Sequence, residues 1–311
     1  MDRRAGWVIG IVFGGLFLCL FCFLGLAWYA LQDEHGSSFA SGRFSGGPRV
    51  GVVEVTGTIM DSKKTLKELR DFADADTIKA IVVRIDSPGG SVGPSQEIYE
   101  AVRKLKDKKH VVMSMGSIAA SGGFYIACAG EKIYANPGTL TGSIGVIFTF
   151  YNVQGLLKWA GVQVAPLTAG KMKDAGSPFK EMTAEERAYF RGVLDDVHDQ
   201  FIQAVADGRG LSVEQVKPLA DGRVFTGRQA KEMKLVDAMG GLEDAVAEAG
   251  RLGGIKGTPK TEYPRKDRRM LAELFGEEAD TLLQGVAARV QEAVGSDGLQ
   301  FRLAPAAGGL P

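Results

Sequence analysis

Two short segments rich in glycine and serine are the first candidates for chemistry. Asp86-Ser-Pro-Gly-Gly90 directly follows an apolar run, and Met115 to Phe124 (MGSIAASGGF) follows another. Proline fixes φ, and paired glycines reach backbone conformations that other residues avoid, so the first segment could turn its amides toward a negatively charged oxygen. An ordinary strand-to-helix turn would use the same residues, and both interpretations stay open at this point.

Ser121 lies within the second segment, where small residues on both sides would let another backbone approach closely. We expect it to begin a helix. Free amides at a helix N-terminus can stabilise an oxyanion, which would suit a nucleophilic serine. A serine that only caps the helix would suit the position equally well, so the segment alone does not decide.

A serine nucleophile needs a base, and the chain has only three histidines. His35 lies in a Gly/Ser-rich stretch, His110 in a charged turn, and His198 in a predicted helix between two aspartates, on a face that we interpret as solvated. This disfavours a Ser-His-Asp arrangement and leaves a lysine or a carboxylate as the base. A lysine can serve only without its proton, which burial or cationic neighbours favour. The sequence does not show which lysine is buried.

The elements that must position these segments alternate between strands and helices. Strands are predicted over Val50 to Met60, Ile78 to Ile85, Val111 to Met115 and Lys132 to Ala135. Helices are predicted between them over Leu66 to Ala73, Ser95 to Lys106 and Ser121 to Ala129. Such alternation predicts an α/β domain with right-handed crossovers and a mostly parallel sheet.

Further helices are predicted in the second half of the chain. Thr183 and Glu186 have the spacing of a capping box that opens a long helix, about Ala184 to Asp207. Shorter helices are predicted over Val213 to Leu219, Gly227 to Met233, Leu242 to Gly250 and, after a weaker stretch, Leu271 to Val294.

An uncharged N-terminal stretch predicts a membrane anchor. Gly6 to Leu31 would be roughly 39 Å long as a helix, against about 30 Å of hydrocarbon. Arg3 and Arg4 precede the stretch, and Asp33 and Glu34 follow it, which predicts a cytoplasmic N-terminus and an extracytoplasmic remainder. A cleavable signal peptide is the alternative, and it too would export the rest of the chain.

We therefore predict four parts. They are the cytoplasmic N-terminus and transmembrane helix (1–31), a flexible linker (32–49), a folded domain (50–254), and a C-terminal helical extension with a disordered tail (255–311). The 37 basic and 37 acidic residues balance, which argues against nucleic acid as a partner. Two of the three cysteines lie in the apolar N-terminal stretch, so no disulfide framework is expected. No HExxH or histidine cluster occurs, and the CxxC spacing of Cys19 and Cys22 lies within the apolar N-terminal stretch, so we expect neither a metal nor a cofactor.

The two glycine-rich segments, followed by Leu140 to Val146 (LTGSIGV), resemble those of the signal peptide peptidase A family (protease IV type). The resemblance runs from about Val50 to Ala249 and includes three further matches: Lys173-Asp174, Ser177 to Met182, and Asp221 to Arg228. It implies the Clp protease/crotonase-like fold, with repeated β-β-α/βα units and a mostly parallel sheet, here preceded by one transmembrane helix.

The resemblance also implies roles for single residues. It makes Ser121 the nucleophile and Lys173 the general base, with Lys171, two residues away, as the alternative base. It further implies a serine that orients the lysine amine, and two glycine amides that form the oxyanion hole: Ser143, Gly90 and Gly122.

The function implied by the resemblance is that of a serine endopeptidase with a Ser–Lys dyad. It would be anchored by a single span in a bacterial-type inner membrane, with its catalytic domain outside the cytoplasm, and would hydrolyse residual signal peptides and other peptides near the membrane. The single catalytic domain matches the short form of the family, which predicts a homo-oligomeric ring. The alternatives are a crotonase-like enzyme acting on an acyl thioester, which an exported domain disfavours, and an inactive membrane scaffold.

Overall fold

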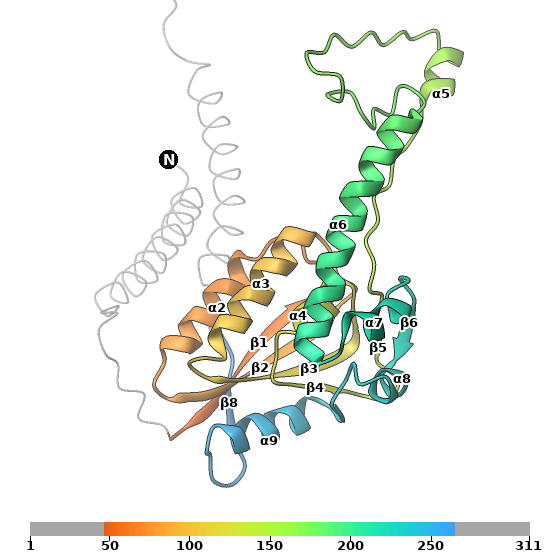
Figure 1. Ribbon diagram of the computed structural model, residues 1–311. Helices are drawn as coiled ribbons and strands as arrows, with labels where there is room; N and C mark the ends of the chain where they lie inside the picture. The colour runs from red at the N-terminus through yellow and green to blue at the C-terminus, as the bar shows by residue number, and fades with distance from the viewer. Residues whose placement is uncertain (1–46, 265–311) are drawn as a thin grey trace, which may run out of the picture. The chain divides into compact units, whose positions relative to one another are not determined.

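A sheet of eight strands forms the centre of the computed structural model, which describes residues 47–264 (Figure 1). The predicted transmembrane helix, residues 32–46 of the linker and the predicted helix over Leu271 to Val294 lie outside the described residues. Among the helices within 47–264, none combines the length and the apolar composition that a membrane span requires.

The strands confirm the predicted parallel sheet. They are β1 (Arg49–Thr56), β2 (Ile78–Ser87), β3 (His110–Ala120), β4 (Lys132–Ala135), β5 (Leu140–Gly142), β6 (Val224–Thr226), β7 (Ala238–Met239) and β8 (Lys260–Glu262). The order is β6-β5-β3-β2-β1-β8, with β4 joining β3 to β7, and every pairing except β5 with β6 is parallel. Strand β8 pairs with β1, so the sheet continues beyond the predicted domain boundary at residue 254.

The helices follow the predicted order, with one addition. They are α2 (Lys63–Asp74), α3 (Val92–Leu105), α4 (Gly122–Ala127), α5 (Gln154–Trp159), α6 (Ala184–Arg209), α7 (Val213–Val216) with a following 3₁₀ turn (Lys217–Leu219), α8 (Gly227–Glu232) and α9 (Leu242–Leu252). The addition is α5. The predicted capping box at the start of α6 is present, with the Thr183 side chain and the Glu186 side chain each accepting a backbone amide of the other.

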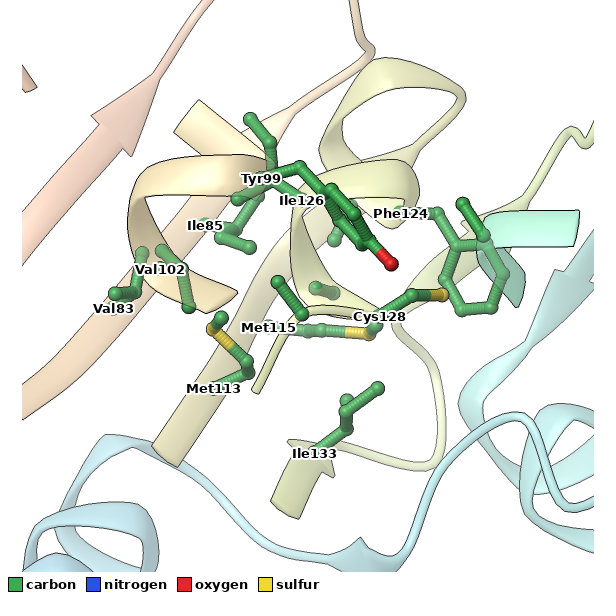
Figure 2. Close-up of a cluster of buried hydrophobic side chains, with 14 of the residues drawn as sticks. Val83, Ile85, Tyr99, Val102, Met113, Met115, Phe124, Ile126, Cys128 and Ile133 are labelled. Carbon is green, nitrogen blue, oxygen red and sulfur yellow. The ribbon is translucent and has the colours of Figure 1, made fainter. Parts of the chain in front are cut away.

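Both faces of the sheet are covered, which explains why its central strands read as nearly continuous apolar runs. Alternate residues of β1, β2 and β3 face opposite sides: Val50, Val52, Ala80, Val82 and Val112 pack with α9. The intervening residues pack with α2, α3 and α4 in the larger core. Figure 2 shows part of this core, where Val83, Ile85, Met113 and Met115 of the strands lie among Tyr99, Val102, Phe124 and Ile126 of the helices.

Strand β3 is shared between two neighbours on one side. Its first half pairs with β4, and its second half, Ile118 to Ala120, pairs with β5. The β2–β3 register shifts between Ile85 and Ser87, opposite this change of partner. The end of β3, which carries the second glycine-rich segment, is therefore held between strand β5 and the end of β2, where the first glycine-rich segment begins.

Helix α6 joins the sheet to a separate segment of residues 147–182, which we call the arm. The C-terminal half of α6 is buried against the core through Phe201, Ile202 and Val205. Its N-terminal half leads away from the sheet, and α5 lies at its far end (Figure 1). Phe148 of the arm meets Phe190 of α6 edge to face, and Phe150 contacts the same ring at a tilt. The arm otherwise exposes much of its apolar surface.

Candidate active site

The segment after β2 is shaped so that one amide is left free. Ser87 Oγ accepts a hydrogen bond from the Gly89 amide (3.1 Å). The Ile59 amide donates to the Gly89 carbonyl (3.0 Å), and the Ser91 amide donates to the Ile59 carbonyl (2.8 Å). In such a parallel bridge the residue between the two partners, Gly90, turns its own amide to the opposite side. Among the described residues, no carbonyl accepts that amide.

The free amide of Gly90 faces the start of α4. A Cβ added to Gly89, whose φ is +103°, would lie 2.7 Å from the Gly122 nitrogen and 2.8 Å from the Ser121 Cβ. A Cβ added to Gly122 would lie 3.4 Å from the Gly90 nitrogen. Gly122 is the first residue of α4, so its amide has no acceptor within the helix. The two predicted oxyanion-hole amides therefore lie next to each other, beside Ser121.

Ser121 has a backbone conformation that few serines adopt. Its φ is +52° and its ψ is −122°, a region that costs of the order of 1–3 kcal/mol for a residue with a side chain. Two hydrogen bonds hold it there: its amide donates to the Gly142 carbonyl (2.9 Å), and its carbonyl accepts the Tyr125 amide (2.8 Å). Its side chain makes no capping hydrogen bond. The alternative interpretation, a serine that only caps α4, is therefore wrong.

Asp86 supports the bend that brings Ser121 to this place. Its side chain occupies the space where Gly116 lacks a side chain, because a Cβ on Gly116 would lie 2.6 Å from the Asp86 Cγ. Its Oδ1 accepts the Ile118 amide (3.1 Å). The aspartate at the start of the first glycine-rich segment is thus bonded to the second.

Ser143 reaches the same pocket from β5. Thr141 Oγ1 donates to the Ala119 carbonyl (2.7 Å) and ties β5 to the end of β3. Ser143 follows β5 with a φ of +51°, and its amide donates to the Arg223 carbonyl (2.8 Å). Both predicted serines line one pocket of about 400 Å³. The structure therefore brings Ser121, Ser143 and the two glycine amides together in a single chain.

One wall of this pocket comes from α6, which the sequence analysis did not include in the site. Arg191, Leu194, Asp195 and His198 line the pocket, with Ala220 to Gly222 beside them. The prediction that His198 lies on a solvated face is wrong: its ring is partly buried, and its Nε2 is buried without a hydrogen-bond partner in the described part of the chain. The 191, 194, 195, 198 spacing was a visible signal of a common helix face. It did not show what that face contacts.

Lys173 does not line the pocket of Ser121. It lies in the arm, exposed, in a turn where its amide donates to the Gly170 carbonyl (3.1 Å). The alternative base, Lys171, pairs with Glu185 at 2.7 Å. Lys180 pairs with both Asp174 (3.0 Å) and Glu186 (2.8 Å), which raises its pKa above the usual value. Of the three lysines at positions 171, 173 and 180, Lys173 is the one without a carboxylate partner among the described residues.

Within one chain, the predicted nucleophile Ser121 and the predicted base Lys173 therefore do not line the same pocket. A hydroxyl and two free amides are in place for attack on a carbonyl and for stabilising the oxyanion that results. In the described residues, no group of three or more histidine, cysteine or acidic side chains is arranged to hold a metal ion.

Several known proteins with similar sequences are peptidases. The model of peptidase family S49 matches residues 103–256, and the Clp protease model matches residues 52–139. A proposed protease of Synechocystis sp. is 46% identical over 209 residues, covering 67% of this chain and 75% of that protein. A proposed signal peptide peptidase SppA of Enterococcus faecium is 37% identical over 182 residues (58% and 53%). Protease 4 of Salmonella typhi is 36% identical over 220 residues (68% and 35%).

These matches extend over the sheet, the Ser121 pocket and the arm, and they favour peptide hydrolysis over the crotonase-like chemistry that the glycine-rich segments left open. The chain belongs to peptidase family S49, the family of signal peptide peptidase A and protease IV, and it is a serine peptidase.

Proposed function

We propose that this serine peptidase is an endopeptidase with a Ser–Lys dyad, in which Ser121 attacks the scissile carbonyl and Lys173 takes the proton from its hydroxyl. The observation that carries the proposal is the position of Ser121 beside two amides without acceptors, those of Gly90 and Gly122. These amides would bind the oxyanion of the tetrahedral intermediate. Lys173 would then return the proton to the leaving amine, and water would release the acyl group from Ser121.

Lys173 would enter the pocket from a second copy of the chain. Its own chain holds it on the arm, away from the residues that line the pocket of Ser121. The arm exposes several large apolar side chains, among them Trp159 at 84% and Leu167, which is fully exposed. Apolar surface of this extent is typical of a surface that another protein covers. The homo-oligomer that the sequence analysis predicts would cover the arm and place Lys173 against a neighbouring Ser121.

The contact between copies would also remove Lys173 from water. A lysine amine acts as a base only in its neutral form, which loss of solvation favours. Ser143, which lines the pocket together with Ser121, would hold the entering amine by a hydrogen bond. This role explains why two serines at positive φ are held in one pocket.

Substrates and location follow from less direct observations. The pocket wall includes the apolar side chains of Val146, Ile147 and Leu194, which suit a peptide with apolar or small side chains near the scissile bond. The uncharged stretch from Gly6 to Leu31 would anchor the chain in a bacterial-type inner membrane, with the peptidase outside the cytoplasm. Signal peptides left in the membrane after cleavage are apolar and lie close to such an anchor, so they are the proposed substrates.

Two inactive variants test the dyad and its assembly together. Ser121→Ala and Lys173→Ala should each abolish turnover of a fluorogenic peptide while the protein stays folded and assembled. Co-expression of the two variants should restore part of the activity, because a mixed oligomer contains contacts in which an intact Ser121 meets an intact Lys173. Ser117→Ala changes an exposed serine of the same segment and should keep full activity.

Each part of the proposal can fail separately. Full activity of Lys173→Ala would reject the base assignment and point to Lys171. Inactive single variants whose mixture also stays inactive would place both members of the dyad in one chain. A fluorophosphonate probe that labels the wild type but not Ser121→Ala would identify the nucleophile. If the wild type shows neither labelling nor turnover, the inactive membrane scaffold is the remaining interpretation.

A further inference from the structure

An ion-pair bridge connects the turn that carries Lys173 to the start of α6. Lys180 Nζ lies 3.0 Å from Asp174 Oδ2 and 2.8 Å from Glu186 Oε1. Asp174 is the residue directly after Lys173 in the chain. The bridge therefore determines where a carboxylate next to the proposed base is held.

The Glu186 end of the bridge is fixed. Glu186 is almost entirely buried, its side chain accepts the Thr183 amide (3.0 Å), and its amide donates to the Thr183 hydroxyl (3.2 Å). Hydrogen bonds to Lys180 and to Thr183 lower the pKa of Glu186, so it stays ionised. A charged and hydrogen-bonded carboxylate at a helix N-terminus is a stable anchor for Lys180.

The Asp174 end of the bridge belongs to a compact turn. The Lys173 amide donates to the Gly170 carbonyl (3.1 Å), and the Ser177 amide donates to the Asp174 carbonyl (3.3 Å). Gly176, with a φ of +75°, packs against the Phe150 ring, where a Cβ would lie 2.6 Å away. The backbone of the turn is thus held on both sides of Asp174, and Lys180 holds its side chain.

We propose that Lys180 is a positioning residue for Lys173: it keeps the Asp174 carboxylate against α6, so that the Lys173 amine enters the active site without an acidic partner. This inference rests on the proposed role of Lys173 as the base. Without Lys180, the Asp174 carboxylate is free to pair with the neighbouring ammonium and to stabilise its charged form, which cannot accept a proton. Repulsion from Glu186 would favour the same movement of Asp174.

Other charged side chains near the bridge have different neighbours. Glu181 and Arg187 line a pocket of about 380 Å³ together with Lys180. Lys171 forms an exposed pair with Glu185, which lies beside Glu186 in the first turn of α6. None of these other side chains takes part in the bridge. Because Lys171 is the alternative base, the control is Lys132, whose ion pair with Glu248 lies on the face of the sheet away from α6.

The test compares Lys180→Met with Lys180→Arg and Lys132→Met in the assembled full chain. Lys180→Met should lower kcat by about tenfold, move the ascending limb of the kcat/KM pH profile to higher pH, and leave KM nearly unchanged. Lys180→Arg keeps the cation and should restore most of the rate. Lys132→Met also removes a lysine and its ion pair, and it should stay within about twofold of the wild type.

A second variant separates this role from support of the fold. Adding Asp174→Asn to Lys180→Met removes the carboxylate that would pair with Lys173, so the pH profile of the double variant should return toward that of the wild type. A purely structural bridge predicts no such return, and the inference is wrong if the double variant keeps the shifted profile. An unshifted profile in Lys180→Met would also overturn it. Activity in Lys173→Ala would instead reject the proposed base itself.

Discussion

The two halves of the proposed active site, one on the sheet and one on the arm, differ in what holds them in place. Gly90, Ser121 and Ser143 follow the buried strands β2, β3 and β5, and backbone hydrogen bonds fix each of these segments. Lys173 lies in an exposed turn of the arm, whose Phe148 and Phe150 rings contact Phe190 of α6. The sheet orders its half within one chain, whereas the half on the arm would be buried by a second copy in the proposed oligomer.

This difference suggests how the enzyme would avoid acting before it is assembled. A chain by itself has a strained serine and free amides, and the proposed base is exposed to solvent on the arm. In the proposed oligomer, assembly would supply the base and exclude water in the same step, because the apolar arm that would contact the neighbour also carries Lys173. Activity should therefore depend on both halves, but through different properties: local backbone geometry in the sheet, and burial between copies in the arm.

The largest expected effect comes from closing the space between the two oxyanion amides. In Gly89→Ala, the new Cβ would meet the Gly122 amide nitrogen at 2.7 Å in a backbone conformation (φ +103°) that alanine disfavours. The amides must then separate, and the loss of one oxyanion donor lowers kcat by about 10²- to 10³-fold. Steady-state kinetics on a fluorogenic peptide would measure the loss.

Gly161→Ala in the arm is the matched control. This glycine also has a positive φ (+71°), but a Cβ there would meet no other atom within 4 Å. It should lose some stability through backbone strain and keep most of its kcat. Equal losses of kcat in the two variants would mean that strain in general, and not the position of the amides, limits the reaction.

The next effect concerns assembly. Leu167→Asp and Trp159→Asp place a charge on side chains that are exposed in the single chain, so the free energy of unfolding of the protomer should change by less than about 0.5 kcal/mol. A charge buried between copies is costly, so the oligomer should dissociate and turnover should fall at least about tenfold. Analytical ultracentrifugation would measure the dissociation of the oligomer, and steady-state kinetics would measure the loss of turnover.

The fluorophosphonate probe distinguishes the two halves in the same variants. Dissociated chains keep the strained Ser121 and its amides but lack the base, so labelling should slow without disappearing. If Leu167→Asp stays active as a monomer, then the arm does not deliver the base between copies, and the comparison between the two halves fails.

Most of the sheet could be predicted from the sequence, because strands buried on both faces read as apolar runs separated by amphipathic helices. Strands β5 to β8 could not, since two or three residues carry no periodicity and their partners are distant in sequence. The glycine-rich segments likewise predicted the surroundings of Ser121, because only glycine permits the close approach seen at Gly89 and Gly122.

Other parts of the site depend on contacts that a local pattern does not contain. The residue spacing around His198 predicted a helix but not what each helix face contacts. The pocket wall formed by α6 was therefore not predicted. The base was indicated by the family resemblance and not by burial, because Lys173 is exposed within its own chain. Lys173 as the base therefore stays a prediction.

The smallest expected effect concerns stability of the sheet half alone. Hydrogen bonds from Arg251 (2.9 Å) and Lys132 (2.5 Å) lower the pKa of Glu248 from its usual value of 4.5 to about 2. A carboxylate whose pKa is lowered by folding stabilises the native state above its unfolded pKa, and this stabilisation is lost as the pH falls toward the folded value. Because both cations are largely solvated, Glu248→Gln should lower the free energy of unfolding by only about 1 kcal/mol at pH 7.

Urea unfolding of the wild type and Glu248→Gln between pH 7 and pH 3 would measure this contribution. The difference between the two proteins should stay constant down to about pH 5 and then shrink, and Glu232→Gln, an exposed glutamate of α8, should show little difference at any pH. Turnover at pH 7 should be unchanged in Glu248→Gln, because the ion pair joins α9 to β4 on the face of the sheet away from α6. A marked loss of turnover would mean that the sheet transmits strain from the Glu248 ion pair to Ser121. The hydrogen bonds around β3 and β5 would then not be sufficient to hold the sheet half of the site in place.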